Sequence, residues 1–270
     1  MRQIFVLTAM LALMASSAWA QALPNHVDPS ARDLTADIAP VPAIRFLTTA
    51  DFPPFNYRDA SGALVGFNID LGRSICDLLK AACTIQAWPW DQASDALRDN
   101  QGDALLAGLA MTPETGESFD FSQVYLAFPA RFVVPAAAAP GFSAQAMAGQ
   151  AVGVRQGSAH EGFLRRYLSQ VTVTPFETEL AALAAVQTGT VKAYFGDGLR
   201  ASFWLNENPD CCAFAGEPYF RPDLFGAGMA VALPAGHDAV RQAIDWALVR
   251  LKRDGALDEL YLRWFPVSFY

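Results

Sequence analysis

The sequence is poor in charged residues, and the charges it has are mainly acidic. Charged residues make up 17 % of the 270, and 27 acidic residues outnumber 19 basic ones, for a formal net charge of −8. A nucleic-acid-binding domain has the opposite balance, so no nucleic-acid partner is expected. Because 53 % of the residues are hydrophobic, the chain can bury a core, which argues against a disordered protein.

Histidine is also scarce. The three histidines, His26, His160 and His237, lie at no metal-ligand spacing relative to the four cysteines. No Ser-His-Asp order of a hydrolase stands out either. We therefore predict no metal, no other cofactor and no catalytic group.

Long apolar runs are missing beyond the N-terminus, where no stretch reaches the roughly 18 residues of a membrane-spanning helix. The N-terminus itself has Arg2, an apolar run over residues 4–14, and the small residues Ala18 and Ala20 around a tryptophan. This three-part pattern predicts a signal peptide over residues 1–20, cleaved near Ala20, and hence export to the periplasm. The proline-rich residues 21–43 are predicted to be a flexible leader.

The four cysteines fit an exported protein, in which an even number favours disulfides. Six residues separate Cys76 from Cys83, whereas Cys211 and Cys212 are adjacent. For the adjacent pair, a vicinal disulfide, a long-range pair or two free thiols are all compatible with the sequence, although export disfavours free thiols.

Short apolar strands alternate with helix-periodic segments along the chain. Strands are predicted at residues 44–47, 104–106, 131–134, 151–154, 171–174 and 191–195, and helices at residues 70–79, 163–168, 180–186, 240–251 and 257–264. This alternation predicts an α/β fold with mostly parallel sheets. Ligands of such folds bind at the carboxyl ends of strands, so the segments after residues 154 and 195 are candidate sites.

The order of short motifs resembles a known family. The motifs are DFPPF at residues 51–55, VGFNID at 65–70, GDALLAG at 102–108, MTPE at 111–114, FDFS at 119–122, VGVRQGS at 152–158, YFGD at 194–197, LFG at 224–226 and DG at 254–255. In this order, from about residue 44 to 270, they resemble the polar-amino-acid family (family 3) of periplasmic solute-binding proteins of ABC transporters. The resemblance is to histidine-binding and lysine/arginine/ornithine-binding proteins in particular.

The resemblance implies a periplasmic binding protein fold of two α/β lobes, joined by two crossing hinge strands, that closes on a ligand in the cleft. Lobe 1 would hold residues 44–126 and 226–270, and lobe 2 residues 127–225. The Cys76–Cys83 spacing is similar to that of a lobe-1 disulfide of the family. The implied partners are a small polar ligand and a membrane permease, and we expect a monomer.

In lobe 1, the resemblance places two aromatic side chains, Phe52 and Trp90, at the walls of the cleft; burial in the core is the alternative for each. Members of the family hold an amino-acid carboxylate with an arginine, and this chain has Thr115 at that position. The neighbouring positions are Gly108 and Ala110. A neutral threonine cannot make the two-pronged contact of a guanidinium, so the ligand need not carry a normally placed carboxylate.

In lobe 2, Gly157 and Ser158 open a helix whose free N–H groups favour an anion, although Ser158 can equally serve as a cap. Arg155 aligns with a ligand-facing position and could replace the missing arginine; a solvated surface arginine is the alternative. Asp197 aligns with the aspartate that binds a ligand ammonium, with a turn or helix cap as its alternative. His160 also aligns with a cleft position, but a solvated histidine at a helix start is the plainer interpretation.

These expectations predict a solute-binding protein of an ABC-type importer for a small polar ligand, cationic or amino-acid-like. Two alternatives remain open. One is an accessory or sensor protein of a dehydrogenase or signalling system. The other is an enzyme similar to cyclohexadienyl dehydratases, which the absence of the lobe-1 arginine disfavours.

Overall fold

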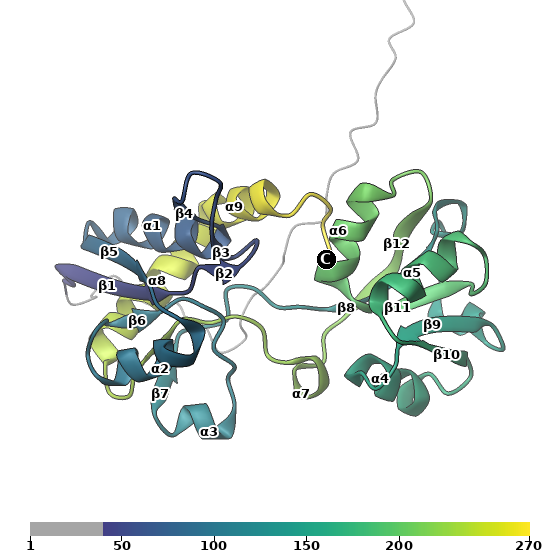
Figure 1. Cartoon of the computed structure of the whole chain (residues 1–270), viewed down its shortest axis with the longest axis horizontal. Coiled ribbons are helices and arrows are strands. Elements are labelled where there is room, and N and C mark those ends of the chain that lie inside the picture. The colour runs from purple at the N-terminus through teal and green to yellow at the C-terminus, as the bar shows by residue number, and fades with distance from the viewer. Residues whose placement is uncertain (1–39) are drawn as a thin grey trace, which may run out of the picture.

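Two lobes lie side by side in the computed structural model, which describes residues 40–270 (Figure 1). The predicted signal peptide and most of the predicted leader lie outside the described residues. No helix within residues 40–270 has the length and apolar character needed to cross a membrane.

The first lobe is built on a five-stranded sheet in the order β5-β1-β6-β13-β7. Its strands are β1 (Ala43–Thr48), β5 (Ala82–Ala87), β6 (Ala104–Leu105), β7 (Phe119–Phe121) and β13 (Ala232–Pro234). Its helices are α1 (Phe67–Leu79), α2 (Trp90–Arg98), α3 (Pro113–Gly116), α8 (Asp238–Arg253) and α9 (Ala256–Trp264). A small antiparallel sheet of β2 (Asp51–Phe52), β3 (Asn56–Arg58) and β4 (Leu64–Val65) stands between β1 and α1 in the chain.

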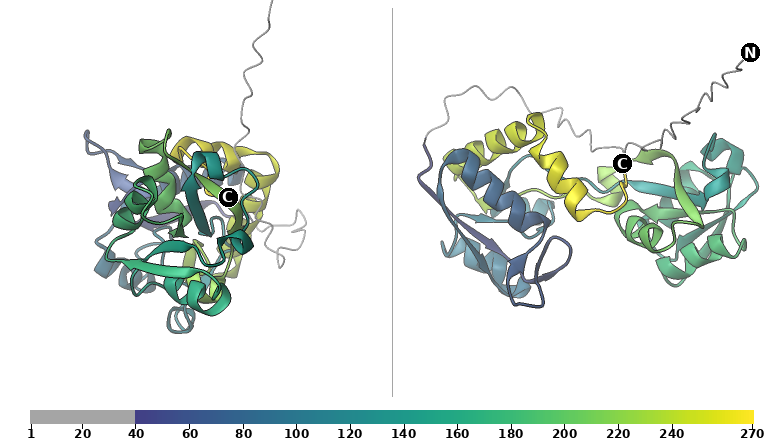
Figure 2. Two further views of the ribbon diagram at one scale, coloured as in Figure 1. Left: turned by 90° about the vertical axis from the view of Figure 1, so that its right-hand side faces the viewer. Right: turned by 90° about the horizontal axis from the view of Figure 1, so that it is seen from above.

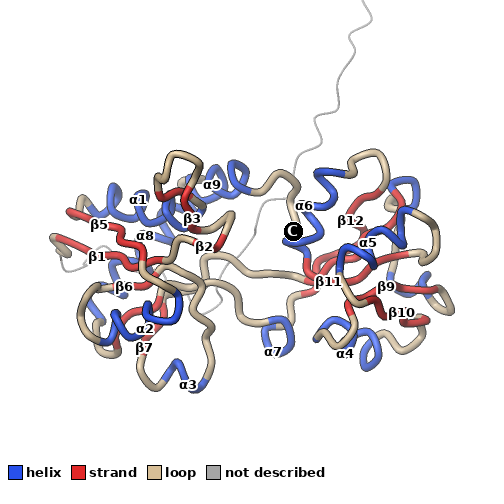
Figure 3. The backbone as a smooth tube through the Cα atoms, viewed as in Figure 1, coloured by secondary structure: helices blue, strands red, loops and turns tan. Residues whose placement is uncertain are grey.

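The second lobe repeats this plan with the order β10-β9-β11-β8-β12. Its strands are β8 (Ala130–Pro135), β9 (Ala151–Arg155), β10 (Thr172–Phe176), β11 (Ala193–Asp197) and β12 (Cys212–Tyr219). Its helices are α4 (Ala159–Tyr167), α5 (Glu179–Gln187) and α6 (Gly198–Glu207), with short 3-10 turns η1 (Ala136–Ala138) and η2 (Ala144–Met147). Figure 3 shows strands in the centre of each lobe and helices around them.

The expectation of mostly parallel sheets is wrong. In each sheet two pairings are parallel and two are antiparallel: β1 pairs in parallel with β5 and β6, but β13 is antiparallel to its neighbours β6 and β7. The antiparallel pairings of β13 arise because the chain passes to the second lobe and back between β7 and β13. The chain leaves the first lobe after β7 and returns as β13, so these strands are not joined by the helical crossovers that parallel neighbours require.

Each predicted strand and helix is present, with shifts of a few residues at the ends. The predicted helix at residues 70–79 is α1, which begins at Phe67. It buries Leu71 and Ile75 against the first lobe's core, as helical spacing requires.

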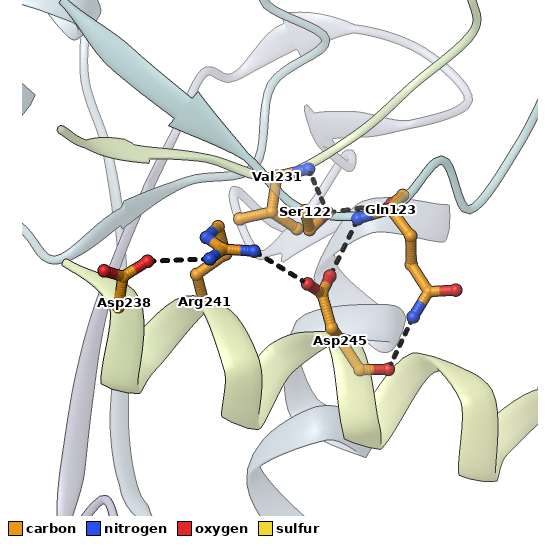
Figure 4. Close-up of polar contacts among 6 residues, drawn as sticks. All are labelled: Ser122, Gln123, Val231, Asp238, Arg241 and Asp245. Atoms are coloured by element: carbon orange, nitrogen blue, oxygen red, sulfur yellow. Dashed lines mark hydrogen bonds and ion pairs between the residues drawn. The ribbon is translucent and has the colours of Figure 1, made fainter. Parts of the chain in front are cut away.

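Two extended linkers, residues 122–129 and 220–231, connect the lobes and pair briefly with each other through Leu126 and Met229. The second linker carries the short helix α7 (Pro222–Phe225). Figure 4 shows that the first linker is bonded to α8 of the first lobe and that the end of the second linker is bonded to the first linker. The Asp245 carboxylate of α8 accepts from the Gln123 N–H at 2.7 Å, and the Val231 N–H donates to the Ser122 hydroxyl at 2.9 Å.

The C-terminal residues also reach the second lobe, as the view from above in Figure 2 shows. After α9, Phe265 and Phe269 are buried in the core of the first lobe, while Val267 packs against a hydrophobic cluster of the second. The chain end therefore contacts both lobes next to the linkers.

Two disulfides are present. Cys76 in α1 is bonded to Cys83 in β5, which confirms the pairing implied by the resemblance. The adjacent Cys211 and Cys212 are bonded to each other, so of the three open alternatives the structure has the vicinal disulfide.

Candidate ligand-binding cleft

The first lobe has a cavity of about 280 Å³ at the carboxyl ends of its strands. Its lining comes from the loop after β1, from β2, from the start of α2 and from the residues after β6: Thr49, Asp51, Phe52, Trp90, Ala107 and Gly108. This is where ligands bind in open α/β sheets. Three predicted site residues, Phe52, Trp90 and Gly108, are thus brought together in one wall.

Two large aromatic side chains of this cavity are unusually exposed. Phe52 is 41 % exposed and Trp90 is 51 % exposed. Neither is a core residue, so the core-burial alternative is wrong for both. The Phe52 ring rests against the ring of Phe55, with centroids 4.8 Å apart, and its open side faces the cavity residues. Exposed aromatic faces on a cavity are suited to stacking on a ligand.

Gly108 allows the Phe52 ring to take this place. Its φ angle is +78°, a conformation that favours glycine. A Cβ at this position would stand 3.3 Å from the Phe52 ring and 3.1 Å from the Met229 methyl group. The glycine is therefore required both by the backbone and by the close approach of the aromatic wall.

Asp51 and Thr49 complete the cavity, and sequence reasoning did not single them out. The Asp51 side chain is exposed, and its carboxylate forms no hydrogen bond or ion pair within the described residues. The sequence does indicate Asp51 as a candidate, because it directly precedes the predicted cleft aromatic Phe52 after the first strand. Asp51 gives the cavity wall a negative charge.

Thr115 and Ala110 do not line this cavity. Thr115 lies in α3, where its hydroxyl donates to the Ala110 carbonyl oxygen at 2.7 Å and accepts from the Thr112 N–H at 2.9 Å. Together with the Thr112 side chain it forms a capping box. The hydroxyl is thus hydrogen-bonded within the turn, and it carries no positive charge with which to bind a carboxylate as a guanidinium does.

A buried polar network lies behind the cavity. The Asn56 side-chain amide donates to the Thr49 hydroxyl at 2.7 Å, and the Asn68 side-chain amide donates to Asn56 Oδ1 at 2.8 Å. The Tyr125 hydroxyl donates to Asn68 Oδ1 at 2.9 Å, and burial raises the pKa of this phenol. Because each member is satisfied, the network fixes β3, α1 and the first linker relative to the cavity wall.

In the second lobe, the helix start at Ser158 is already occupied by groups of the protein. The Ser158 hydroxyl caps α4 by accepting from the Glu161 N–H at 3.2 Å. The Glu161 carboxylate accepts from the Gly157 N–H at 2.7 Å and pairs with Arg165. The cap predicted as the alternative for Ser158 is confirmed. The Gly157 N–H is already hydrogen-bonded to a carboxylate of the protein, that of Glu161.

Asp197 ends β11 and caps α6. Its carboxylate accepts from the Arg200 N–H at 2.9 Å, so the predicted helix-cap alternative is present. The position is half-buried at a strand's carboxyl end, beside His160 and Glu179. Burial raises the pKa of Glu179, with the charge of Arg200 acting in the opposite direction and that of Asp197 adding to the rise.

His160 packs under the second linker. Its ring is stacked on Phe225 of α7, with centroids 4.6 Å apart, and it also contacts Phe195 edge-on. Burial lowers the pKa of His160, although the negative charge of Asp197 partly opposes this. The expectation of a solvated histidine is therefore wrong. Arg155, at the end of β9, is exposed.

The predicted residues thus form two groups. Phe52, Trp90 and Gly108 lie in the cavity wall of the first lobe. Arg155, Gly157, Ser158 and Asp197 lie at strand ends and helix starts of the second lobe. A ligand that met both groups would lie between the lobes.

The chain matches the family model of bacterial extracellular solute-binding proteins, family 3, over residues 44–267. The chain belongs to this family. A protein of Escherichia coli K12 named as arginine-binding protein 2 of an ABC transporter is 31 % identical, with 82 % of this chain and 90 % of that protein covered. The lysine/arginine/ornithine-binding periplasmic protein of the same bacterium is 27 % identical, with 84 % and 89 % covered.

Solved structures share the two-lobed fold of this solute-binding family member. The L-cystine solute receptor of Neisseria gonorrhoeae, in its unliganded open conformation, superposes with a TM-score of 0.72 at 20 % identity, with 84 % of this chain and 94 % of that chain covered. An ancestral cationic amino acid solute-binding protein superposes with a TM-score of 0.61 at 25 % identity, with 83 % and 96 % covered. The fold class predicted from the sequence is confirmed.

Proposed function

We propose that this protein is a periplasmic receptor that binds a small cationic, amino-acid-like solute and delivers it to the permease of an ABC importer. One observation carries the proposal: the carboxylate of Asp51 and the exposed rings of Phe52 and Trp90 line the same cavity. The names of the two relatives, which refer to arginine and to lysine, arginine and ornithine, support a cationic ligand.

The chemistry of the cavity wall favours a cation in two ways. Aromatic faces attract a cation through their quadrupole, most strongly where water is excluded. A carboxylate adds direct charge complementarity and accepts charge-assisted hydrogen bonds from ammonium or guanidinium groups. Among the residues that line the cavity there is no histidine, cysteine or basic side chain, so its wall suits binding better than proton transfer.

The second lobe would complete the site when the lobes close. Asp197 would add a second negative charge beside a ligand ammonium, and Arg155 is the second lobe's candidate partner for a ligand carboxylate. Ser158 would present its capped helix start to the same space. Such closure by hinge motion is the common behaviour of two-lobed receptors. We also propose that the mature protein is a monomer released by cleavage of the signal peptide.

Isothermal titration calorimetry of the mature protein would test the proposal. The panel consists of arginine, lysine, ornithine and histidine, with glutamine and glutamate as neutral and acidic counterparts. We expect binding of a cationic member and a weakening of about 10- to 150-fold in Asp51→Asn, the equivalent of the roughly 1.5–3 kcal/mol of a hydrogen bond to a charged group. Phe52→Ala should weaken binding similarly.

Asp210→Asn is the matched control, since this exposed carboxylate lies in the second lobe away from the cavity. It should leave the affinity unchanged. Binding of glutamate in preference to every cation, or equal affinities in Asp51→Asn and the unmodified protein, would show that the proposed ligand class is wrong.

A further inference from the structure

A second cavity of about 300 Å³ adjoins the first in the same lobe. It lies between the β2–β3 hairpin and the segment that enters α2, and its lining is Ala50, Asp51, Arg58, Ala87, Trp88 and Pro89. Asp51 lines both cavities, so the two cavities adjoin at this residue. A ligand longer than the first cavity could extend past Asp51 into the second.

Arg58 gives the second cavity a positive charge, and within residues 40–270 it forms no ion pair with Asp51 or any other carboxylate. One guanidinium nitrogen donates to the Gly62 carbonyl oxygen at 2.8 Å, which holds the side chain against the β3–β4 turn. Within residues 40–270 Arg58 forms no ion pair, whereas Arg45 and Arg73 of the same lobe each pair with an aspartate. Its remaining N–H groups are therefore available, and a guanidinium binds carboxylates in a two-pronged geometry.

Trp88 also lines this cavity, and it packs against the hydrophobic cluster behind it. Arg58 is therefore the group that makes the second cavity suited to an oxyanion, beside a first cavity suited to a cation.

The first lobe needs such a site if its ligand is an amino acid. The family's carboxylate-binding arginine is replaced by Thr115, whose hydroxyl is engaged with Ala110 and Thr112. The lining of the first cavity contains no cation. The adjoining cavity, which shares Asp51 with the first, holds Arg58.

We propose that the second cavity is a carboxylate subsite: the ligand is an elongated dipolar solute whose cation lies at Asp51, Phe52 and Trp90 and whose carboxylate binds Arg58. The inference rests on the proposed function, which supplies the cation site. A solute of this class has its cationic end separated from its carboxylate by a flexible chain. The first lobe then holds both ends of the ligand before closure.

Arginine and agmatine are suitable probes, because agmatine is arginine without its carboxylate. In calorimetric titrations we expect the unmodified protein to bind arginine at least about tenfold more tightly than agmatine, the size of a lost hydrogen bond to a charged group. Arg58→Gln should remove this preference by weakening arginine alone. Arg73→Gln is the matched control, since Arg73 pairs with Asp70 outside both cavities, and it should keep the preference.

Arg155→Gln separates this subsite from a carboxylate contact in the second lobe. If Arg155→Gln removes the preference for arginine and Arg58→Gln keeps it, the subsite is wrong and the carboxylate binds across the cleft. Equal binding of both probes, lost equally in Asp51→Asn, also overturns the subsite but leaves the proposed cation receptor standing. If neither probe binds, the proposed function fails and the subsite fails with it.

Discussion

The phenol of Tyr270 is hydrogen-bonded to both backbone polar groups of Ala127, its carbonyl oxygen and its N–H. Its O–H donates to the Ala127 carbonyl oxygen at 2.7 Å and accepts from the Ala127 N–H at 3.2 Å. Ala127 lies in the first linker, and the Tyr270 ring stacks on Phe220 of the second, with centroids 5.9 Å apart. The last described residue thus ties the two linkers together at the place where hinge closure must change the backbone.

Tyr270→Phe tests this tie, because it removes both hydrogen bonds and keeps the ring. We expect a loss of about 1–3 kcal/mol in the free energy of unfolding, since the half-buried Ala127 groups lose their partner. We also expect the open and closed populations to shift, which small-angle scattering with and without ligand would report. Tyr57→Phe is the control, since its ring contacts Trp264 of α9. Identical scattering and stability in both variants would show that the tie has no role.

Gly108→Ala should weaken ligand binding beyond its effect on stability. The added Cβ would stand 3.3 Å from the Phe52 ring and displace it from the cavity wall. Gly141→Ala is a close control, because Gly141 has a φ of +74° but nothing within 4 Å of an added Cβ. Both variants should lose about 1 kcal/mol of stability from backbone strain. Only Gly108→Ala should lose affinity for the arginine probe by titration, and equal affinities would contradict the role given to Phe52.

The alternating strands and helices and the exposure of Phe52 follow from local sequence patterns, whereas other features depend on contacts between distant segments. The periodicity of residues 70–79 specifies α1, and the loop position of Phe52 indicates its exposure. In contrast, the antiparallel pairing of β13 depends on a chain that leaves the lobe and returns. The burial of His160 likewise depends on Phe225, which is 65 residues away in the sequence and has no local signal.

Arg131→Met should leave the protein as stable as before or stabilise it. The Arg131 side chain is 5 % exposed, its Nε and one terminal nitrogen have no partner, and burial lowers its pKa to about 10. Replacement of a poorly compensated buried ion by an apolar side chain of similar length is neutral or stabilising by about 1–4 kcal/mol. Arg131→Ala should instead destabilise by about 2–4 kcal/mol, because the stem packs beside Gly198 and the guanidinium lies over the Phe214 ring. Chemical denaturation of both variants checks this, and a loss above about 2 kcal/mol in Arg131→Met would refute it.

His160 should make the folded state less stable at acidic pH. Its pKa in the folded protein lies below the ordinary value of 6.5, so between these two values the unfolded chain binds more protons. The contribution of neutral His160 is fully present above pH 6.5 and is lost as the pH falls through the folded-state pKa. In this window the free energy of unfolding should fall by at most about 1.4 kcal/mol per pH unit from this residue.

The comparison of His160→Gln with the unmodified protein isolates this contribution from the other groups that titrate between pH 7 and 5. Urea denaturation across that range should give a shallower pH dependence in His160→Gln, because glutamine does not titrate. A slope that is the same in His160→Gln as in the unmodified protein would mean that protonated His160 is tolerated beneath Phe225. In that case the negative charge of Asp197 would offset the cost of burial.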